Sequence, residues 1–334
     1  MSAATAPSAA VGRRTLAVLL LIPVVAALVL AVFAWPAARI APRDLPIGVA
    51  GPAAAAEAVE RGLGRHAGAF EIHRYADAGA ARAAIEDRDV YGAVVVTPGG
   101  TELLTASAGS PVVAGLLREA VTAQAPAGAP VAVTDVVAAP AGDPRGAVLG
   151  ASLLPLALAG AATGVVTVLL GLRGARAAAV LAGASALAGL VGAALADSWL
   201  GALTGDWWAE AGILGLTVLA IGSAFAGLAT LLGKPGFGLG AALTILLGNA
   251  FSGMSSAPEL LPTGVGALGQ WLPPGAAGSA LRSVSAFDGA AAGRPVLVLA
   301  LWAAAGLAAT ALGARRRTEA APAPERVPAP VPVN

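Results

Sequence analysis

Six stretches of this chain are apolar and almost free of charge, and they constrain its fold more than any other feature. They cover residues 16–35, 148–172, 177–196, 211–232, 237–251 and 296–312. About 20 apolar residues in a helix cross the ~30 Å hydrocarbon core of a bilayer. Only 12% of the residues are charged, against roughly 25% in soluble domains. The sequence therefore predicts a mainly α, polytopic helical membrane protein with about six transmembrane helices.

The first apolar run has two interpretations, a transmembrane helix and a secretory signal peptide. Arg13 and Arg14 precede it, and a basic start followed by an apolar stretch is also typical of a secretory signal peptide. At about 20 residues the run is long for a signal sequence, and a cleavage pattern is only weakly present near Ala37 and Ala38. We expect an uncleaved first transmembrane helix over residues 15–36.

Residues 37–146 differ in composition and carry most of the carboxylates of the chain. LPIGVAG, FEIHRY, YGAVVV, ELLTAS and VAVTDVV read as strands, whereas PAAAAEAVERGLGR, AGAARAAIEDRD and PVVAGLLREAVTAQ read as helices. In the last helix Val113, Leu117 and Val121 recur at helical spacing, which indicates one buried face. Alternation of strands and helices predicts a small extracytoplasmic α/β domain between spans one and two.

The positions of the basic residues predict the orientation, because lysine and arginine in short loops stay on the cytoplasmic side. With six spans, all the basic clusters fall on one side: Arg13 and Arg14, Arg173 and Arg176, Lys234, and residues 315–317. We expect a multi-pass protein of a bacterial cell (inner) membrane, with a cytoplasmic N-terminus over residues 1–14. A five-helix transmembrane domain would cover residues 147–314, followed by a disordered, proline-rich cytoplasmic tail over residues 315–334. Trp199, Trp207 and Trp208 suit an interfacial belt on the outer side.

Several classes of chemistry find no support. The chain has no cysteine and two histidines, without the spacing of a metal site. GLATLLGKP lacks the spacing and the hydroxyl of a phosphate-binding loop. A net charge of +1 gives no reason to expect a nucleic-acid partner. We therefore expect no enzyme, no catalytic residues, no metal and no cofactor, and we interpret the run Glu86 to Asp89 as a solvated helix end.

The spans themselves are almost free of ionisable side chains, which disfavours an ion-coupled carrier. They contain glycines four residues apart, Gly160 with Gly164 and Gly236 with Gly240. This spacing lets helix backbones approach closely in lipid. It predicts packing within the molecule or, alternatively, a subunit interface.

Residues 255–294, between the last two apolar stretches, form a distinct outer segment. TGVGALGQWL and PGAAGSALRSVSAF can each form a short helix, and Pro273 and Pro274 prevent their fusion. Neither is long enough to span a bilayer. We expect a re-entrant pair of helices, with Trp271 near the interface and Arg282 kept in protein or water; the alternative is an ordinary surface loop.

This layout resembles the permeases of type-2 ATP-binding-cassette exporters, and is nearest to the branch of phage-infection-protein-like bacterial membrane proteins. The resemblance covers nearly the whole chain. It rests on GNAFSGMSSAPELLP, on LGQWLPPGAAGSALRSVSAFDG before the last span, and on DPRGAVLGASLLPLALAG at span two. It implies re-entrant outer helices, a homo- or heterodimer, a separate ATPase chain, and export of lipids, drugs or polysaccharides. The connection GLRGARA departs from the family, which usually has a coupling helix there.

The sequence thus predicts a permease subunit that moves a hydrophobic or amphipathic substrate outward through the lipid bilayer. The alternative is a non-transporting envelope protein whose outer domain binds a ligand, a partner or phage. The candidate residues for the substrate path are Asn249, Trp271, Pro273, Pro274 and Arg282.

Overall fold

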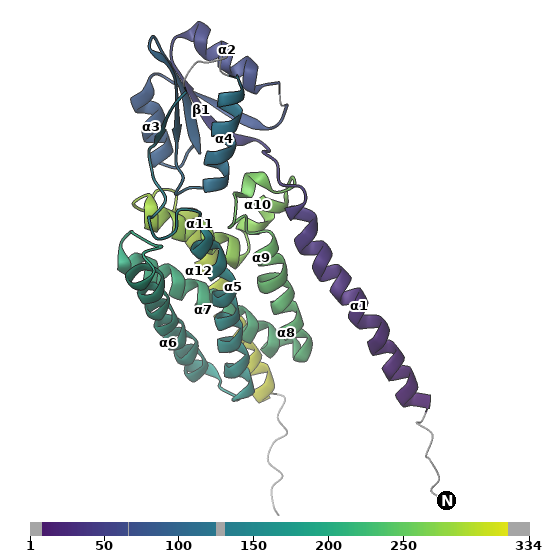
Figure 1. The fold of residues 1–334 in the computed structure, drawn as a ribbon. Helices are drawn as coiled ribbons and strands as arrows, with labels where there is room; N and C mark the ends of the chain where they lie inside the picture. The colour runs from purple at the N-terminus through teal and green to yellow at the C-terminus, as the bar shows by residue number, and fades with distance from the viewer. Residues whose placement is uncertain (1–8, 66, 125–130, 320–334) are drawn as a thin grey trace, which may run out of the picture.

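The computed structural model describes residues 9–65, 67–124 and 131–319. The described chain is mainly helical, with a small α/β domain at one end of a helical bundle (Figure 1). Residues 1–8 of the expected N-terminus, residues 320–334 of the expected tail, and His66 lie outside the described residues.

A five-stranded mixed sheet forms the centre of the α/β domain. Its strands occupy the positions that the sequence predicted: β1 Leu45–Ala50, β2 Phe70–Tyr75, β3 Gly92–Thr97, β4 Gly100–Thr105 and β5 Ala132–Asp135. The strand order is β2-β1-β3-β4-β5. Strands β3 and β4 pair antiparallel through a tight hairpin turn, and all other pairs are parallel.

Three helices cover the sheet: α2 Ala53–Leu63, α3 Ala78–Glu86 and α4 Pro111–Gln124. Side chains alternate between the two faces of a strand. Leu45, Ile47 and Val49 of β1 therefore share one apolar cluster with α2 and α4, including Val113. Ala50 belongs to the second cluster, on the face that α3 covers. The predicted α/β domain is thus a sheet with a buried layer on each face.

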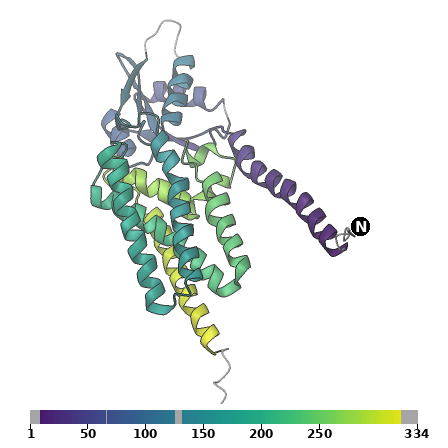
Figure 2. The same ribbon diagram turned by 60° about the horizontal axis from the view of Figure 1, so that its bottom comes forward.

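Among the described residues, five helices are long and apolar enough to cross a membrane. They are α1 Ala9–Ala37, α5 Ala147–Leu169, α6 Gly174–Ala193 with its π-helical continuation η1 Ala194–Trp199, α7 Trp207–Leu232 and α12 Gly293–Glu319. Helix α7 is the centre of the bundle, because 78% of its most apolar 18-residue stretch is buried. Helices α5, α6 and α12 pack around it (Figures 1 and 2).

The sixth expected span is helical but irregular. It consists of α8 Lys234–Gly240, the π-helical η2 Ala241–Leu247 and α9 Gly248–Ala250, which are 7, 7 and 3 residues long. Together they run from the lower end of the bundle towards the α/β domain (Figure 1). The five longer spans are confirmed as helices of spanning length, whereas the expected total of six is not.

The glycine pairs pack within the molecule. A Cβ atom on Gly160 would lie 2.8 Å from the Cβ of Ile221, and one on Gly164 would lie 2.3 Å from the carbonyl oxygen of Gly222. A Cβ on Gly236 would lie 2.2 Å from a backbone oxygen of α7. These helix surfaces are therefore covered by the chain's own α7, and the alternative of a subunit interface is wrong at these positions.

The two terminal helices are longer than expected. Helix α1 begins at Ala9 rather than at residue 15, and α12 continues to Glu319, beyond the expected start of the tail at residue 315. Arginine and glutamate are good helix formers, so the basic run after the last span does not end the helix. Most of the described part of α1 stands apart from the bundle (Figures 1 and 2), and none of its most apolar stretch is buried. Only its C-terminal end approaches α9 and η2.

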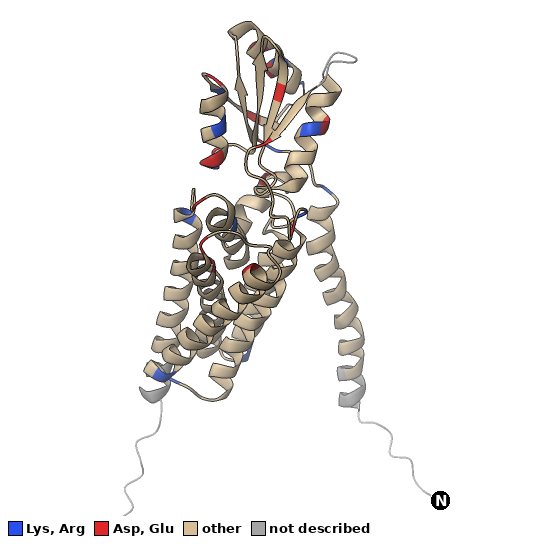
Figure 3. Ribbon diagram, turned by 60° about the vertical axis from the view of Figure 1, so that its left-hand side comes forward, with Lys and Arg blue, Asp and Glu red and all other residues tan. Residues whose placement is uncertain are grey.

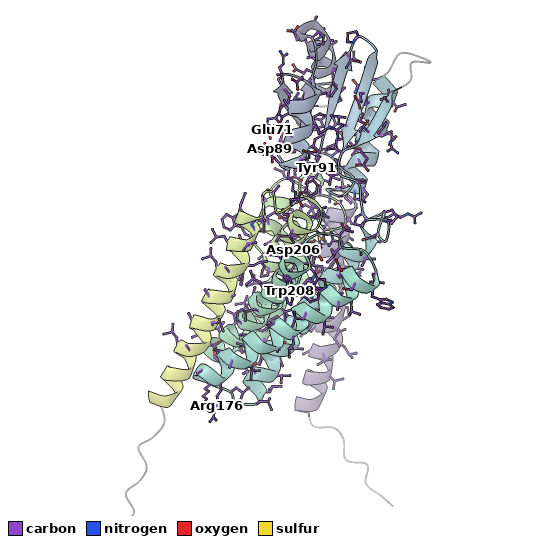
Figure 4. All side chains as sticks on the ribbon, turned by 90° about the vertical axis from the view of Figure 1, so that its left-hand side faces the viewer. Glu71, Asp89, Tyr91, Arg176, Asp206 and Trp208 are labelled. Carbon is purple, nitrogen blue, oxygen red and sulfur yellow. The ribbon has the colours of Figure 1, made fainter. Side chains whose placement is uncertain are left out.

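Charged residues gather in the α/β domain and at the helix ends, and the helices between them are almost free of charge (Figure 3). Arg176 lies at the end of the bundle that is farthest from the α/β domain, whereas Tyr91 lies where the domain meets the bundle (Figure 4). The arrangement matches a molecule with a basic end and an opposite end that carries the sheet.

Candidate functional site

The segment of residues 255–294 lies between the α/β domain and the bundle (Figure 1). It contains the 3-10 helix η3 Pro258–Leu260, α10 Val265–Gln270 and α11 Pro273–Ala286. Pro273 and Pro274 occupy the first turn of α11, where a missing N–H costs no helical hydrogen bond. The prediction of two short helices separated by these prolines is confirmed. Most of α11 is buried, so the alternative of a surface loop is wrong.

Apolar and backbone contacts fix the α/β domain on this segment. Phe287, just after α11, belongs to the apolar cluster on the α3 face of the sheet. Leu260 belongs to the cluster on the opposite face. The Leu260 carbonyl also accepts hydrogen bonds from the Ala41 N–H, at 3.1 Å, and from Arg43 Nη1, at 2.9 Å. The domain is therefore held on both sides of its sheet.

Arg88 forms the main polar contact from the α/β domain to α11. Its Nη1 donates to the Ser279 carbonyl at 2.9 Å and to Ser283 Oγ at 2.6 Å. Its guanidinium also lies 5.2 Å from the ring centroid of Phe287. The interpretation of residues 86–89 as a wholly solvated helix end is wrong at Arg88. The chain turns there with a φ of +64°, which sends this side chain into the junction while its acidic neighbours stay exposed.

Tyr91 and Arg282 lie beside this contact. The Tyr91 hydroxyl donates to Glu259 Oε2 at 2.8 Å. Arg282 is only 7% exposed, and its Nη2 donates to the Met254 carbonyl. The sequence correctly singled out Arg282 as a residue kept inside protein or water, but it gave no indication of its neighbours Arg88, Tyr91 and Glu259.

Arg88, Tyr91, Glu259 and Arg282 line one cavity, which we call the junction cavity. Its volume is about 510 Å³. It extends from the buried Arg282 to the exposed Arg294, with Ile85, Val90 and Phe287 on its apolar wall. Its charged lining residues are Arg88, Arg282, Arg294 and Glu259. Three guanidinium groups therefore face a space with one carboxylate.

Burial has opposite effects on the titratable groups of the junction cavity, because it disfavours the charged form of each. It lowers the pKa of Arg282 to about 10, with the nearby charge of Arg88 acting in the same direction. Burial also lowers the pKa of Arg88. Burial and the neighbouring Glu259 raise the pKa of Tyr91. At neutral pH the arginines are therefore cationic, and the phenol is a neutral donor.

Asn249 lies at a different place from Arg282. Its Nδ2 donates to the carbonyl of Ile245, one turn earlier in the same helical segment, at 2.9 Å. It lines a second cavity of about 280 Å³ between α1, α5 and α9, which we call the lateral cavity. Phe33 and Leu153 are among its apolar lining residues. Met254, whose carbonyl binds Arg282, also lines this cavity.

The other candidate residues lie near the junction cavity but do not line it. Trp271 is 54% exposed, and Arg294 lies 5.3 Å from its ring centroid. Its carbonyl accepts a hydrogen bond from Trp302 Nε1 at 2.8 Å. Pro274 is buried and contacts the backbone at Gly248. The five candidates therefore do not converge on one site.

One buried carboxylate was missed by the sequence interpretation. Glu210 lies in the first turn of α7 and is fully buried. Its Oε1 accepts from the Gly205 N–H at 2.9 Å. Asp206 caps the same helix by accepting from Ala209 N–H. Glu210 directly precedes the expected fourth apolar stretch, residues 211–232, so the expectation of spans almost free of ionisable groups is not contradicted, although the helix begins before that stretch. Two acids four residues apart are a signal for a helix start.

The part of the chain that the structure describes contains no group of three or more histidine, cysteine, aspartate or glutamate residues placed to hold a metal ion. The expectations of no metal, no cofactor and no catalysis stay predictions. The junction cavity offers guanidinium donors, one phenol donor and one carboxylate, a set suited to binding rather than to proton transfer by histidine.

Comparison with protein-family models, with curated proteins and with solved structures finds no match to this chain. The class of the molecule therefore rests on its own features. Among the described residues, five helices of spanning length that are almost free of charge between their ends are those of a multi-pass membrane protein.

Proposed function

We propose that this chain is the membrane subunit of a type-2 ATP-binding-cassette exporter. It moves a hydrophobic or amphipathic substrate outward, and a separate ATPase chain supplies the energy. The observation that carries the proposal is the lateral cavity, because it lies between the detached α1 and the bundle and has apolar walls with Asn249 beside them. Such a cavity gives an apolar molecule a side entrance from the bilayer.

The charge distribution supports the orientation that export requires. Arg173 precedes α6, Lys234 begins α8, and Arg176 lies at the end far from the sheet (Figure 4). Basic residues in short loops favour the cytoplasmic side. In this orientation both termini are cytoplasmic, the α/β domain lies outside a bacterial inner membrane, and the ATPase binds at the basic end.

The exposed apolar surface of α1 supports the expected assembly into a dimer. Val24, Leu28 and Leu30 are among its exposed apolar side chains, and lipid or a second subunit must cover them in a membrane. A homo- or heterodimer in which α1 lines the contact would cover this surface and enlarge the substrate path.

The test is purification of the tagged full-length chain from its native host in a mild detergent, with mass spectrometry of stoichiometric partners. We expect an ATPase with a complete phosphate-binding loop, and a control exporter purified in parallel shows that the detergent preserves such complexes. Recovery of this chain without an ATPase, while the control complex stays intact, would refute the proposal.

A second function is favoured by one specific observation. The larger cavity lies at the α/β junction rather than among the spanning helices, and only residues 170–173 connect α5 to α6. Both features suit an envelope protein that binds a ligand, a partner or phage through its outer domain. Charge reversal of the exposed Arg82 and Arg118 distinguishes the two functions, because a receptor would lose binding whereas an exporter would keep transport.

A further inference from the structure

The junction cavity contains one buried cation, Arg282, and one partly buried cation, Arg88, and neither has an ion-pair partner among the described residues. Among the described residues, the only acid–base pairs within 4 Å are Glu71 with His73 and Glu60 with Arg74. Arg88 and Arg282 therefore have no carboxylate at ion-pair distance. The nearby acid, Glu259, instead accepts the hydrogen bond of Tyr91.

Such an arrangement is costly in an isolated protein. A buried cation loses its hydration. This loss is normally compensated by a paired carboxylate, by several hydrogen-bond acceptors or by a bound anion. Arg282 also experiences the like charge of Arg88, and the single carboxylate of Glu259 offsets only part of the positive charge of the two side chains. The positive charge of these two side chains therefore exceeds what their surroundings neutralise.

Both guanidinium groups also keep donors free. The structure gives Arg282 one hydrogen bond, from Nη2 to the Met254 carbonyl, and gives Arg88 two, both from Nη1. An arginine has five N–H donors in a planar fork. Both side chains line the junction cavity, so their remaining donors have access to its contents.

We propose that the junction cavity binds an oxyanion of the phosphate or carboxylate class, which pairs with Arg88 and Arg282. Guanidinium forks match the geometry of such groups and form paired hydrogen bonds with them. Arg294, at the exposed end, attracts the anion into the cavity. This site holds whether the chain exports a substrate or anchors a receptor, because it depends only on the junction.

The volume and the apolar lining of the junction cavity indicate the chemistry of the rest of the ligand. A volume of about 510 Å³ is in the range of small-molecule sites rather than of a single ion. Ile85, Val90 and Phe287 provide apolar contact next to the arginines. The ligand class is therefore an anionic head with an attached organic part, either a soluble metabolite or the headgroup of an anionic lipid.

The first arm of the test uses inorganic phosphate. The full-length protein is purified in a neutral detergent, and its Tm is followed by tryptophan fluorescence while phosphate replaces chloride at constant ionic strength. We expect Tm to rise with phosphate in a saturable manner. Arg282→Gln should weaken the apparent affinity on the order of 10- to 100-fold, because it removes charge-assisted hydrogen bonds.

Glu259→Gln should change the phosphate affinity in the opposite direction. It removes the only carboxylate among the lining residues but keeps an acceptor for Tyr91, so phosphate should bind at least about threefold more tightly. This variant keeps the test decisive if Arg282→Gln fails to fold. Arg74→Gln is the matched control, because Arg74 lies on the outer surface with Glu60 as its partner, and its phosphate response should equal that of the wild type.

The second arm identifies the source of the anion. The protein is reconstituted in nanodiscs of phosphatidylcholine, with or without phosphatidylglycerol. A Tm increase with phosphatidylglycerol that Arg282→Gln abolishes, without a response to inorganic phosphate, assigns the site to a lipid headgroup. A response to phosphate in both nanodiscs assigns it to a soluble anion. The proposal is overturned if neither probe raises Tm, or if Arg282→Gln and Glu259→Gln both respond as the wild type does.

Discussion

Gly164→Ala tests the packing that places the bundle beneath the junction cavity. An added Cβ would lie 2.3 Å from the carbonyl oxygen of Gly222 and 2.7 Å from the Cβ of Phe225. Ordinary contacts begin near 3.4 Å, so α5 has to retreat from α7 by roughly 1 Å. Overpacking of this kind costs about 1–3 kcal/mol. The higher helix propensity of alanine offsets at most ~1 kcal/mol of that cost.

Gly183→Ala is the matched control, because it lies inside α6 and an added Cβ meets nothing within 4 Å. It gains the same propensity without a clash, so the two variants should differ by the overpacking cost alone, about 1–3 kcal/mol in free energy of unfolding. The measurement is unfolding of the purified proteins in mixed micelles with increasing dodecyl sulfate. If Gly164→Ala proves as stable as Gly183→Ala, the described contact between α5 and α7 is wrong.

Three further predictions concern residues outside the bundle core. Asp143 accepts three backbone N–H groups at the start of α5, so Asp143→Ala should lower the free energy of unfolding by about 1–2 kcal/mol. Asp143→Asn should keep most of that stability, and an equal loss of stability in both variants would contradict the capping role. Ala291 has a φ of +56°, and Ala291→Gly should raise Tm by relieving about 1 kcal/mol of backbone strain. An unchanged or lower Tm would refute the presence of strain at this residue. The hydrogen bond from Arg74 lowers the pKa of Glu60 below 4.5. The stability that this pair contributes is therefore present above the unfolded pKa and lost as the pH falls through the lower folded pKa. The Tm difference between wild type and Glu60→Gln should shrink below about pH 4.5, and a difference that is constant with pH would contradict the pairing.

The long helices and the strands could be predicted from the sequence because their signals are local. Val113, Leu117 and Val121 mark the buried face of α4 by spacing alone, and the structure buries all three. The structure of the irregular segment 234–250 was harder to predict, since its hydropathy does not show where glycines and π-helical turns interrupt the helix. The central position of α7 depends on which helix surfaces meet, and its composition resembles that of its neighbours.

The junction was predicted only in part. Pro273 and Pro274 indicate a broken helix by a local rule, and a lone arginine in an apolar segment is a local anomaly, so Arg282 could be found. Arg88 could not, because its partner Ser279 lies 191 residues further along the chain. A charge run is usually solvated, and only the docking of the α/β domain partly buries Arg88.

The central claim is that the sheet and the basic end of the bundle lie on opposite sides of a membrane, and the absence of cysteine from the chain makes this directly measurable. Glu71→Cys places a thiol on the exposed surface of the α/β domain, and Ala175→Cys places one beside Arg176, at the other end of the molecule (Figure 4). Intact cells are treated with a membrane-impermeant maleimide, and a second sample is treated after the membrane has been opened. We expect labelling of Glu71→Cys in intact cells, and of Ala175→Cys only in opened ones. Equal labelling of both variants in intact cells, or the reverse pattern, would contradict the topology on which the proposed function depends.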